Sequence, residues 1–175
     1  MILSQYYIKK EISRQMKKQP ERSSRKFCSL QKANRLLVFC SYSDLDVIDK
    51  QLSQLKSDNK DVILCVYSTT GDNSEKLSEN DIIISPGKDL TMLGFPKQEK
   101  LDKCLSVGCD IIIDLTCGKV PALQYMLLKH NAPFKVGVKS NDMDLYDLTI
   151  STSEAAEIDY LFSQILFYLQ TISFK

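Results

Sequence analysis

The sequence predicts an α/β protein of three-layer, Rossmann-like architecture, with helices on both faces of a mostly parallel six-stranded sheet. Two observations lead to this prediction. Short, mostly apolar runs such as 35–40 and 109–115 are typical of strands that are buried on both faces. These runs alternate with segments of helical periodicity, as in parallel sheets covered by helices. Right-handed crossovers then give the strand order 3-2-1-4-5-6.

The elements follow from apolar spacing and from breaks in it. The predicted strands are residues 35–40, 61–67, 81–85, 109–115, 134–138 and 146–150. The predicted helices are residues 2–18, a segment carrying Leu45, Ile48, Leu52 and Leu55, residues 97–107, a segment from about 121 to 130, and residues 154–172. In the first of them, Ile8, Ile12 and Met16 are spaced by four along one side, with Lys and Arg on the others. Pro20 is expected to end or kink the first helix, and residues 21–32 to form a second short helix or a tether. The connecting segment 90–96 is expected to expose Met92, Leu93 and Phe95.

Several residues predict local features at the ends of these elements. Ser43 or Asp44 suits the N-cap of the helix that follows. Pro86 and Gly87 favour a turn, and Gly108 suits the left-handed position that ends a helix. His130 is expected near the last carbonyls of its helix.

Charge is distributed unevenly along this chain of 175 residues. Residues 1–35 carry ten Lys or Arg against Glu11 and Glu21, a net +8, so the remaining residues carry −7 of the total +1. We therefore divide the chain into a basic helical segment, 1–32, and one Rossmann-like domain, 33–175. The basic segment is either a solvated helix on the protein's own acidic body or an arm for an acidic partner, a nucleic acid or an anionic lipid surface.

The location predicted for the protein is the cytoplasm. The first residues lack the apolar core and cleavage site of a signal peptide, and no run approaches the ~18 apolar residues of a membrane span. The six cysteines are then expected to be reduced thiols, with Cys40 and Cys65 as small buried residues of strands.

A ligand is expected where the strand order reverses, beyond the carboxyl ends of the strands. That point lies between the loop after the first strand and the loop after the fourth strand. The candidate ligand-binding residues there are Ser41, Tyr42, Ser43, Asp44, Asp114, Thr116, Cys117, Gly118 and Lys119.

The stretch Thr116–Lys119 before a helix could bind an anion through backbone N–H groups and a lysine, or could be a simple turn. It lacks the remaining residues of a phosphate-binding P-loop. Cys117 could have a lowered thiol pKa at the start of the helix and act as a nucleophile, or be a small loop residue. His130 lies three turns along the same helix, about 20 Å away, so it cannot serve as its base. Neither catalytic residues nor a cofactor are assigned, and the spacing of Cys104, Cys109 and Cys117 fits no zinc pattern.

The second half of the chain carries a family likeness. Residues 112–116 (Ile-Ile-Asp-Leu-Thr), the helix to Asn131, residues 134–137 (Phe-Lys-Val-Gly) and residues 146–150 (Tyr-Asp-Leu-Thr-Ile) resemble an uncharacterised family of small bacterial proteins with a domain of unknown function. That resemblance extends to the basic first helix and the closing helix. Residues 33–150 are also distantly similar to the N-terminal Rossmann-like half of heptosyltransferase-type glycosyltransferases. This second resemblance implies the fold; such enzymes bind the sugar nucleotide mainly in a C-terminal domain, so transfer by this chain alone is not expected.

Three functions remain open from the sequence. The favoured one is a non-catalytic protein whose basic N-terminal helix binds a protein partner, including a second copy. The alternatives are a domain or degenerate transferase half that binds a nucleotide or sugar phosphate at the predicted crevice, and a nucleic-acid-binding protein that uses the basic arm. Enzymatic activity is left open.

Overall fold

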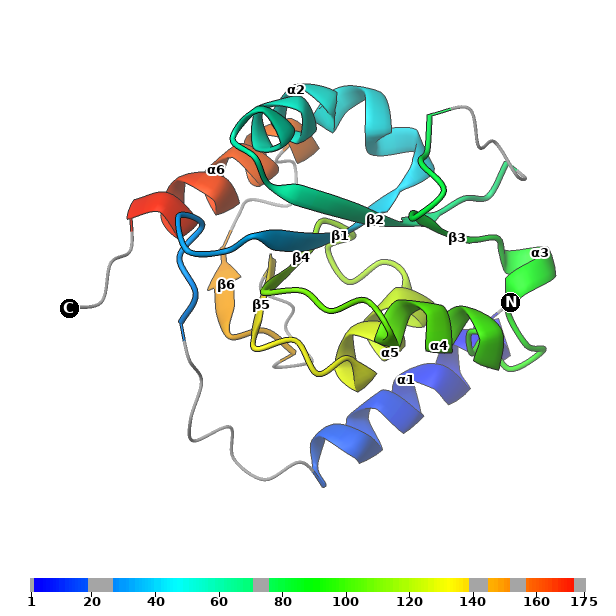
Figure 1. The fold of residues 1–175 in the computed structure, drawn as a ribbon. Helices are drawn as coiled ribbons and strands as arrows, with labels where there is room; N and C mark the ends of the chain where they lie inside the picture. Colours follow the sequence, from blue (N-terminus) through cyan, green and yellow to red (C-terminus); the bar gives the residue numbers. More distant parts are fainter. Residues whose placement is uncertain (1, 19–26, 71–75, 139–144, 152–156, 172–175) are drawn as a thin grey trace.

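The computed structural model describes residues 2–18, 27–70, 76–138, 145–151 and 157–171. Its six strands form one sheet, all parallel, in the order β3-β2-β1-β4-β5-β6. Helices cover both faces of this sheet, which gives three layers (Figure 1). The predicted fold class and strand order are confirmed. Among the described helices, none combines the length and the apolar character needed to cross a membrane.

The strands are shorter at the sheet's edges than at its centre. Their bounds are β1 (Arg35–Ser41), β2 (Asp61–Tyr67), β3 (Ile82–Ile84), β4 (Ile111–Asp114), β5 (Phe134–Val138) and β6 (Leu148–Ile150). In the middle of the sheet, Leu36 of β1 lies between Val62 of β2 and Ile111 of β4. Because β1 and β4 are neighbours, the strand order reverses between them as predicted.

Two helices cover one face, α2 (Leu45–Ser57) and α6 (Ile158–Thr171), and they contact each other. Three lie on the other face: α1 (Ile2–Met16), α4 (Gln98–Leu105) and α5 (Pro121–Lys129) (Figure 1). The short helix α3 (Pro86–Asp89) follows β3, and a one-turn 3-10 helix, η1 (Tyr42–Asp44), follows β1. The predicted end of the first helix at Pro20 lies outside the described residues, as do 21–26 of the predicted tether.

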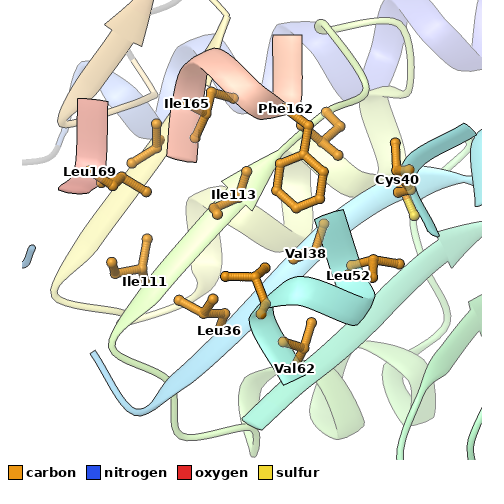
Figure 2. Packing of buried hydrophobic residues seen from close by; sticks show 14 of the residues in the cluster. Leu36, Val38, Cys40, Leu52, Val62, Ile111, Ile113, Phe162, Ile165 and Leu169 are labelled. Atoms are coloured by element: carbon orange, nitrogen blue, oxygen red, sulfur yellow. The ribbon is translucent and has the colours of Figure 1, made fainter. Parts of the chain in front are cut away.

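The face under α2 and α6 is packed with aliphatic and aromatic side chains. Leu36 and Val38 of β1 and Ile113 of β4 meet Phe162 and Ile165 of α6 in one buried cluster (Figure 2). Side chains alternate along a strand, so the intervening residues point to the opposite face. Complete burial of each such side chain stabilises the fold by roughly 1.5–3 kcal/mol.

The opposite face buries the inner side of α1. Leu37, Phe39 and Ile112 of the sheet belong to one cluster with α5 and with Ile8 and Ile12, which are 1% and 0% exposed. The apolar spacing of four residues predicted from the sequence therefore marks the buried side of α1. The basic helix is attached to the sheet's own core through this side. The division at residues 32 and 33 remains a prediction.

Asp44 takes the predicted N-cap position, but the left-handed conformation predicted for Gly108 is wrong; in both places backbone groups satisfy the helix end. Asp44 occupies the N-cap of α2 but its side chain makes no capping bond, since Ser43 Oγ donates to Asp44 Oδ1 at 3.1 Å and the Leu45 amide bonds Tyr42 O. Gly108 is not left-handed: α4 ends in a turn in which the Val107 amide donates to Cys104 O at 3.1 Å. The predicted turn at Pro86 is instead the first turn of α3, with Pro86 at its start.

The carboxyl end of α5 is held by a buried lysine rather than by His130. Lys135 Nζ donates to Leu127 O at 2.7 Å and to His130 O at 2.6 Å, which satisfies carbonyls that the helix leaves free. His130 Nδ1 accepts from the Ala132 amide at 2.9 Å, so Nε2 carries the proton and donates to Val107 O at 3.0 Å. Burial lowers the pKa of His130, which keeps the ring neutral near pH 7. His130 thus lies at the C-cap of α5 as predicted and its amide donates to Met126 O, but its ring bonds Val107 O and not the last carbonyls of the helix.

Candidate functional site

Asp114, the last residue of β4, is fully buried and accepts three hydrogen bonds. Thr116 donates to Oδ1 through its backbone amide at 2.8 Å and through Oγ1 at 2.6 Å. The Tyr146 hydroxyl donates to Oδ2 at 2.7 Å. Burial raises the pKa of Asp114, and the bonds from Thr116 and Tyr146 act in the opposite direction. The carboxyl group thus joins the turn after β4 to the segment between β5 and β6.

The ring of Tyr146 fills the space beyond β5. A Cβ on Gly137 would lie 2.4 Å from Cε1 of this ring, so only glycine fits at this position of β5. Tyr146 is 2% exposed, and its burial and the neighbouring Asp114 both raise its pKa. At the end of β5, a tyrosine ring therefore occupies room that a ligand would need.

The turn after β4 contains two consecutive residues in the left-handed region, Cys117 with φ 52° and Gly118 with φ 73°. For a cysteine this conformation costs on the order of 1–3 kcal/mol. Burial and then Asp114 raise the pKa of the Cys117 thiol, and Lys119 lowers it less. The hypothesis of a lowered thiol pKa is wrong, because the thiol is half-buried beside a carboxyl group. The thiol donates to Leu115 O at 3.5 Å, as a loop residue would.

The loop after β1 approaches this turn from the side of α2. Ser41 ends β1, Tyr42 is half-buried, and both Tyr42 and Cys117 pack against the cluster under α2 and α6. Asp44 is close enough to raise the pKa of Cys117. The structure thus brings the two predicted loops together, but Asp114 and Thr116 are buried and bonded to each other, and Ser43 bonds Asp44. Lys119 is exposed and belongs to a different hollow.

That hollow is a pocket of about 190 Å³ on the α1 side of the turn. It lies where the start of α1 meets the carboxyl ends of β2 and β3 and the start of α5; the amino end of α1 lies next to α3 in Figure 1. Among the described residues that line it, Lys119 alone is charged and none carries a carboxylate. The lining comprises Gln5, Ile8, Tyr67, Pro86, Leu90, Thr91, Gly94 and residues 119–122.

One wall of this pocket is a tight turn at residues 91–94. The Thr91 amide donates to Phe95 O at 2.8 Å, the Gly94 amide donates to Thr91 O at 2.9 Å, and Gly94 takes a φ of 82°. Met92 and Leu93 project from the turn and are 98% and 49% exposed, as predicted. Phe95 is half-buried and packs edge-on against Tyr125 with ring centroids 5.2 Å apart, so its predicted exposure is wrong.

The outer face of α1, next to the pocket, is basic and aromatic. The Lys and Arg side chains of α1 and of the turn that follows it are all exposed: Lys9, Lys10 and Arg14 in the helix, and Lys17 and Lys18 just after its last residue. The one acidic residue of the helix, Glu11, bonds Arg14 at 2.7 Å, and this bond lowers the pKa of Glu11 to about 2. Tyr6 and Tyr7 are 58% and 48% exposed, with Lys10 Nζ 5.9 Å above the Tyr6 ring. We call these seven residues the basic face of α1.

A second hollow of about 470 Å³ lies on the α2 side, and three of its charged lining residues, Asp46, Lys76 and Asp81, are bonded to other groups. Lys76 forms an ion pair with Asp46 at 2.5 Å. Asp81 accepts bonds from the Leu64 amide at 2.8 Å and from the Ser78 amide and hydroxyl at 2.8 and 2.7 Å. These bonds hold the segment before β3 against β2, which is a structural role.

The pocket lies at the carboxyl edge of the sheet where a ligand was predicted, and of its lining residues only Lys119 is among the predicted ligand-binding residues. The rule about carboxyl ends of strands also applies to β2 and β3, and this could have pointed to Tyr67 and Pro86. Gln5 and Ile8 carry no such signal. Cys104 lies on α4, Cys109 lies before β4, and Cys117 lies after β4. Within the described ranges, no three His, Cys, Asp or Glu side chains are grouped as metal ligands would be.

Comparison with known proteins identifies the family. The chain belongs to a family of unknown function, DUF6913. The family model matches residues 5–172, from α1 to the end of α6 and just beyond. The predicted likeness to an uncharacterised family that includes both terminal helices is confirmed.

Other similarities are weaker. The fold is similar to that of an exopolyphosphatase-related protein from Bacteroides fragilis, with 18% identity and a TM-score of 0.49 over 80% of this chain. The matched part covers 40% of that longer protein. None of the curated proteins matches the sequence. The distant similarity to heptosyltransferase-type enzymes has no support among these comparisons.

Proposed function

We propose that this protein is a non-catalytic binding protein that holds an acidic protein partner on the basic face of α1. The observation that carries the proposal is the division of this helix into two sides. Ile8 and Ile12 are buried in the core, while five Lys or Arg and two tyrosines face solvent. The buried side fixes the position of the charges, so the basic face is a rigid surface.

A protein partner is favoured over a nucleic acid by the turn at residues 91–94, which lines the same pocket as the first turns of α1. Met92 and Leu93 are exposed apolar side chains on a hydrogen-bonded turn, and tyrosine, methionine and arginine are enriched at protein interfaces. Phosphate backbones offer no apolar group to such a turn. A second copy of the chain is one acidic candidate, because the residues after 35 carry a net −7.

The alternative of a nucleotide or sugar-phosphate ligand has less support. The pocket of about 190 Å³ is smaller than the roughly 300–1,000 Å³ of small-molecule sites, and it offers one cation. The cytoplasm remains the predicted location, and the six free thiols suit a reducing compartment.

The experiment compares two anionic probes on the intact chain, one a peptide and one a nucleic acid. Fluorescent oligoglutamate and oligouridylate of equal length are titrated by anisotropy at about 50 and 200 mM salt, with the double variant Lys10→Glu, Lys17→Glu and the matched control Lys50→Glu on α2. We expect oligoglutamate to bind and the double variant to weaken it by about 10-fold or more, because two cations become anions. The control should bind as the wild type does.

Tighter binding of oligouridylate, with a steep salt dependence, would instead identify a nucleic-acid-binding protein. Binding of neither probe overturns the proposal. Light scattering of the same variants tests the second copy: a dimer that dissociates only in the double variant would identify the partner as the chain itself.

A further inference from the structure

The pocket beside α1 is mostly apolar and lies against the first turns of this helix, whose outer side carries the basic face. Ile8, Leu90, Val120, Pro121 and Ala122 line it, and Lys119 is the one cation among the described lining residues. Gln5 and Ile8 belong to α1 itself, so this helix forms one wall of the pocket.

The size of the pocket fits one large side chain. An engineered apolar cavity of about 150 Å³ binds benzene. A volume of about 190 Å³ therefore accommodates a phenyl ring or a branched aliphatic group, but not a drug-sized ligand.

The pocket wall also presents apolar surface to a partner. Met92 is 98% exposed although the turn that carries it is closed by the hydrogen bonds of Thr91 and Gly94, so this exposure belongs to an ordered turn. A Phe95 amide bond to Thr91 Oγ1 at 3.2 Å further fixes the turn. An exposed methionine on an ordered turn beside an apolar pocket is typical of a surface that a partner covers on binding.

We propose that this pocket receives one apolar side chain, aromatic or branched aliphatic, of the acidic segment that binds the basic face of α1, with a neighbouring carboxylate of that segment at Lys119. This inference rests on the proposed function and adds the specificity of the same surface. Charge selects an acidic segment, and the pocket selects the segment whose apolar residue is correctly spaced from its acidic ones. Anchor side chains in pockets contribute most of the affinity at such interfaces.

The test uses synthetic peptides in which four glutamates stand on each side of one central residue: phenylalanine, leucine, glycine or lysine. Binding of each peptide is measured by fluorescence anisotropy. We expect the phenylalanine and leucine peptides to bind at least about 10-fold more tightly than the glycine peptide, which is the factor expected when such a side chain is buried.

Two variants act on the pocket by different routes. Ala122→Leu fills it from the start of α5, where Ala122 is 3% exposed. Gln5→Trp covers its mouth from an exposed position of α1, and Gln170→Trp on the outer side of α6 is the matched control. Both pocket variants should reduce the preference for phenylalanine over glycine to about 1, and the control should keep it. If Ala122→Leu fails to fold, Gln5→Trp alone decides.

The outcomes separate this inference from the proposed function. If all four peptides bind with equal affinity and the double variant Lys10→Glu, Lys17→Glu loses this binding, the inference about the pocket is wrong and the proposed role of the basic face is supported. Binding of no peptide overturns both. A preference for phenylalanine that survives both pocket variants places the anchor elsewhere and also overturns the inference.

A small probe examines the pocket without the basic face. 3-Phenylpropionate carries a phenyl ring and one carboxylate, and its binding is followed by methyl NMR of Ile8, Leu90 and Ala122. We expect saturable shifts with a Kd on the order of millimolar, weakened at least about 3-fold by Lys119→Gln and unaffected by Lys50→Gln. The absence of shifts at these methyl groups would contradict the pocket's preference for an apolar group.

Discussion

The two ends of β4 carry the same kind of side chain in opposite surroundings. At the amino end, Asp110 is partly exposed and accepts from the Asn34 amide at 2.7 Å and the Arg35 amide at 3.0 Å, and these bonds lower its pKa. At the carboxyl end, Asp114 is fully buried, and burial raises its pKa despite three hydrogen bonds. Access to water, rather than the number of donors, decides the sign of the shift.

The difference also explains why the open pocket does not lie directly at the carboxyl end of β4, where the strand order reverses. The carboxyl end of β4 is closed by Tyr146 and Thr116, which bond the aspartate that a ligand would meet. The open pocket lies to one side, where α1 and the turn at residues 91–94 form its walls. Four changes, from the largest expected effect to the smallest, test this contrast between the two ends.

Replacing the glycine under Tyr146 should have the largest effect. Gly137→Ala places a methyl group 2.4 Å from the ring, so the ring must move and its bond to Asp114 is lost; we expect a loss of about 2–4 kcal/mol in urea unfolding. Gly108→Ala, near the amino end, meets nothing within 4 Å and has no positive φ. It should be neutral or stabilising by up to about 1 kcal/mol. Equal effects would show that Tyr146 does not close the carboxyl end.

Removing the hydroxyl alone should cost less. Tyr146→Phe leaves the ring in place but takes a donor from a buried carboxyl group, and we expect a loss of about 1–3 kcal/mol at pH 7. Tyr168→Phe, on the exposed side of α6, is the control and should stay within about 0.5 kcal/mol. A Tyr146→Phe variant as stable as the control would mean that the hydroxyl contributes nothing.

The two aspartates should give stability profiles of opposite slope with pH. The folded pKa of Asp114 is raised, so its contribution is present below the unfolded pKa and lost as pH rises through the folded value. The pKa of Asp110 is lowered, so its contribution is present above the unfolded pKa and lost as pH falls through the folded value. The stability of Asp114→Asn relative to wild type should therefore be higher at pH 7 than at pH 3. The relative stability of Asp110→Asn should be lower at pH 7 than at pH 3. Unfolding free energies across this range measure both slopes, and slopes of the same sign would contradict the contrast.

The smallest effect concerns the cysteines near the two ends. Burial raises the pKa of Cys109 to about 12 and also raises that of Cys117. At pH 8, both thiols should react with iodoacetamide at least about 10-fold more slowly than a free thiol, because the thiolate is the reacting form. Mass spectrometry of the labelled peptides measures each rate. Fast labelling of Cys117 alone would revive its interpretation as a nucleophile.

Much of the fold could be predicted because it depends on local patterns. The apolar run of β1 marked a strand buried on both faces, and the spacing of Ile8 and Ile12 marked the inner side of α1. Of the pocket, the sequence pointed to the carboxyl edge of the sheet and to Lys119. The position of His130 at the end of α5 was also predicted, but not that Lys135, from the next strand, supplies the side-chain bonds there.

The sequence by itself determined the strand order, the basic side of α1 and the exposure of Met92 and Leu93, because periodicity and charge act over a few neighbouring residues. Only the tertiary structure decided that Tyr146 occupies the end of β5 and that Gln5 and Tyr67 line one pocket. These residues are far apart in the chain, and which of them meet depends on how helices pack on the sheet. Packing of this kind also decides whether an aspartate at a strand end is solvated or enclosed, and hence where this protein can bind.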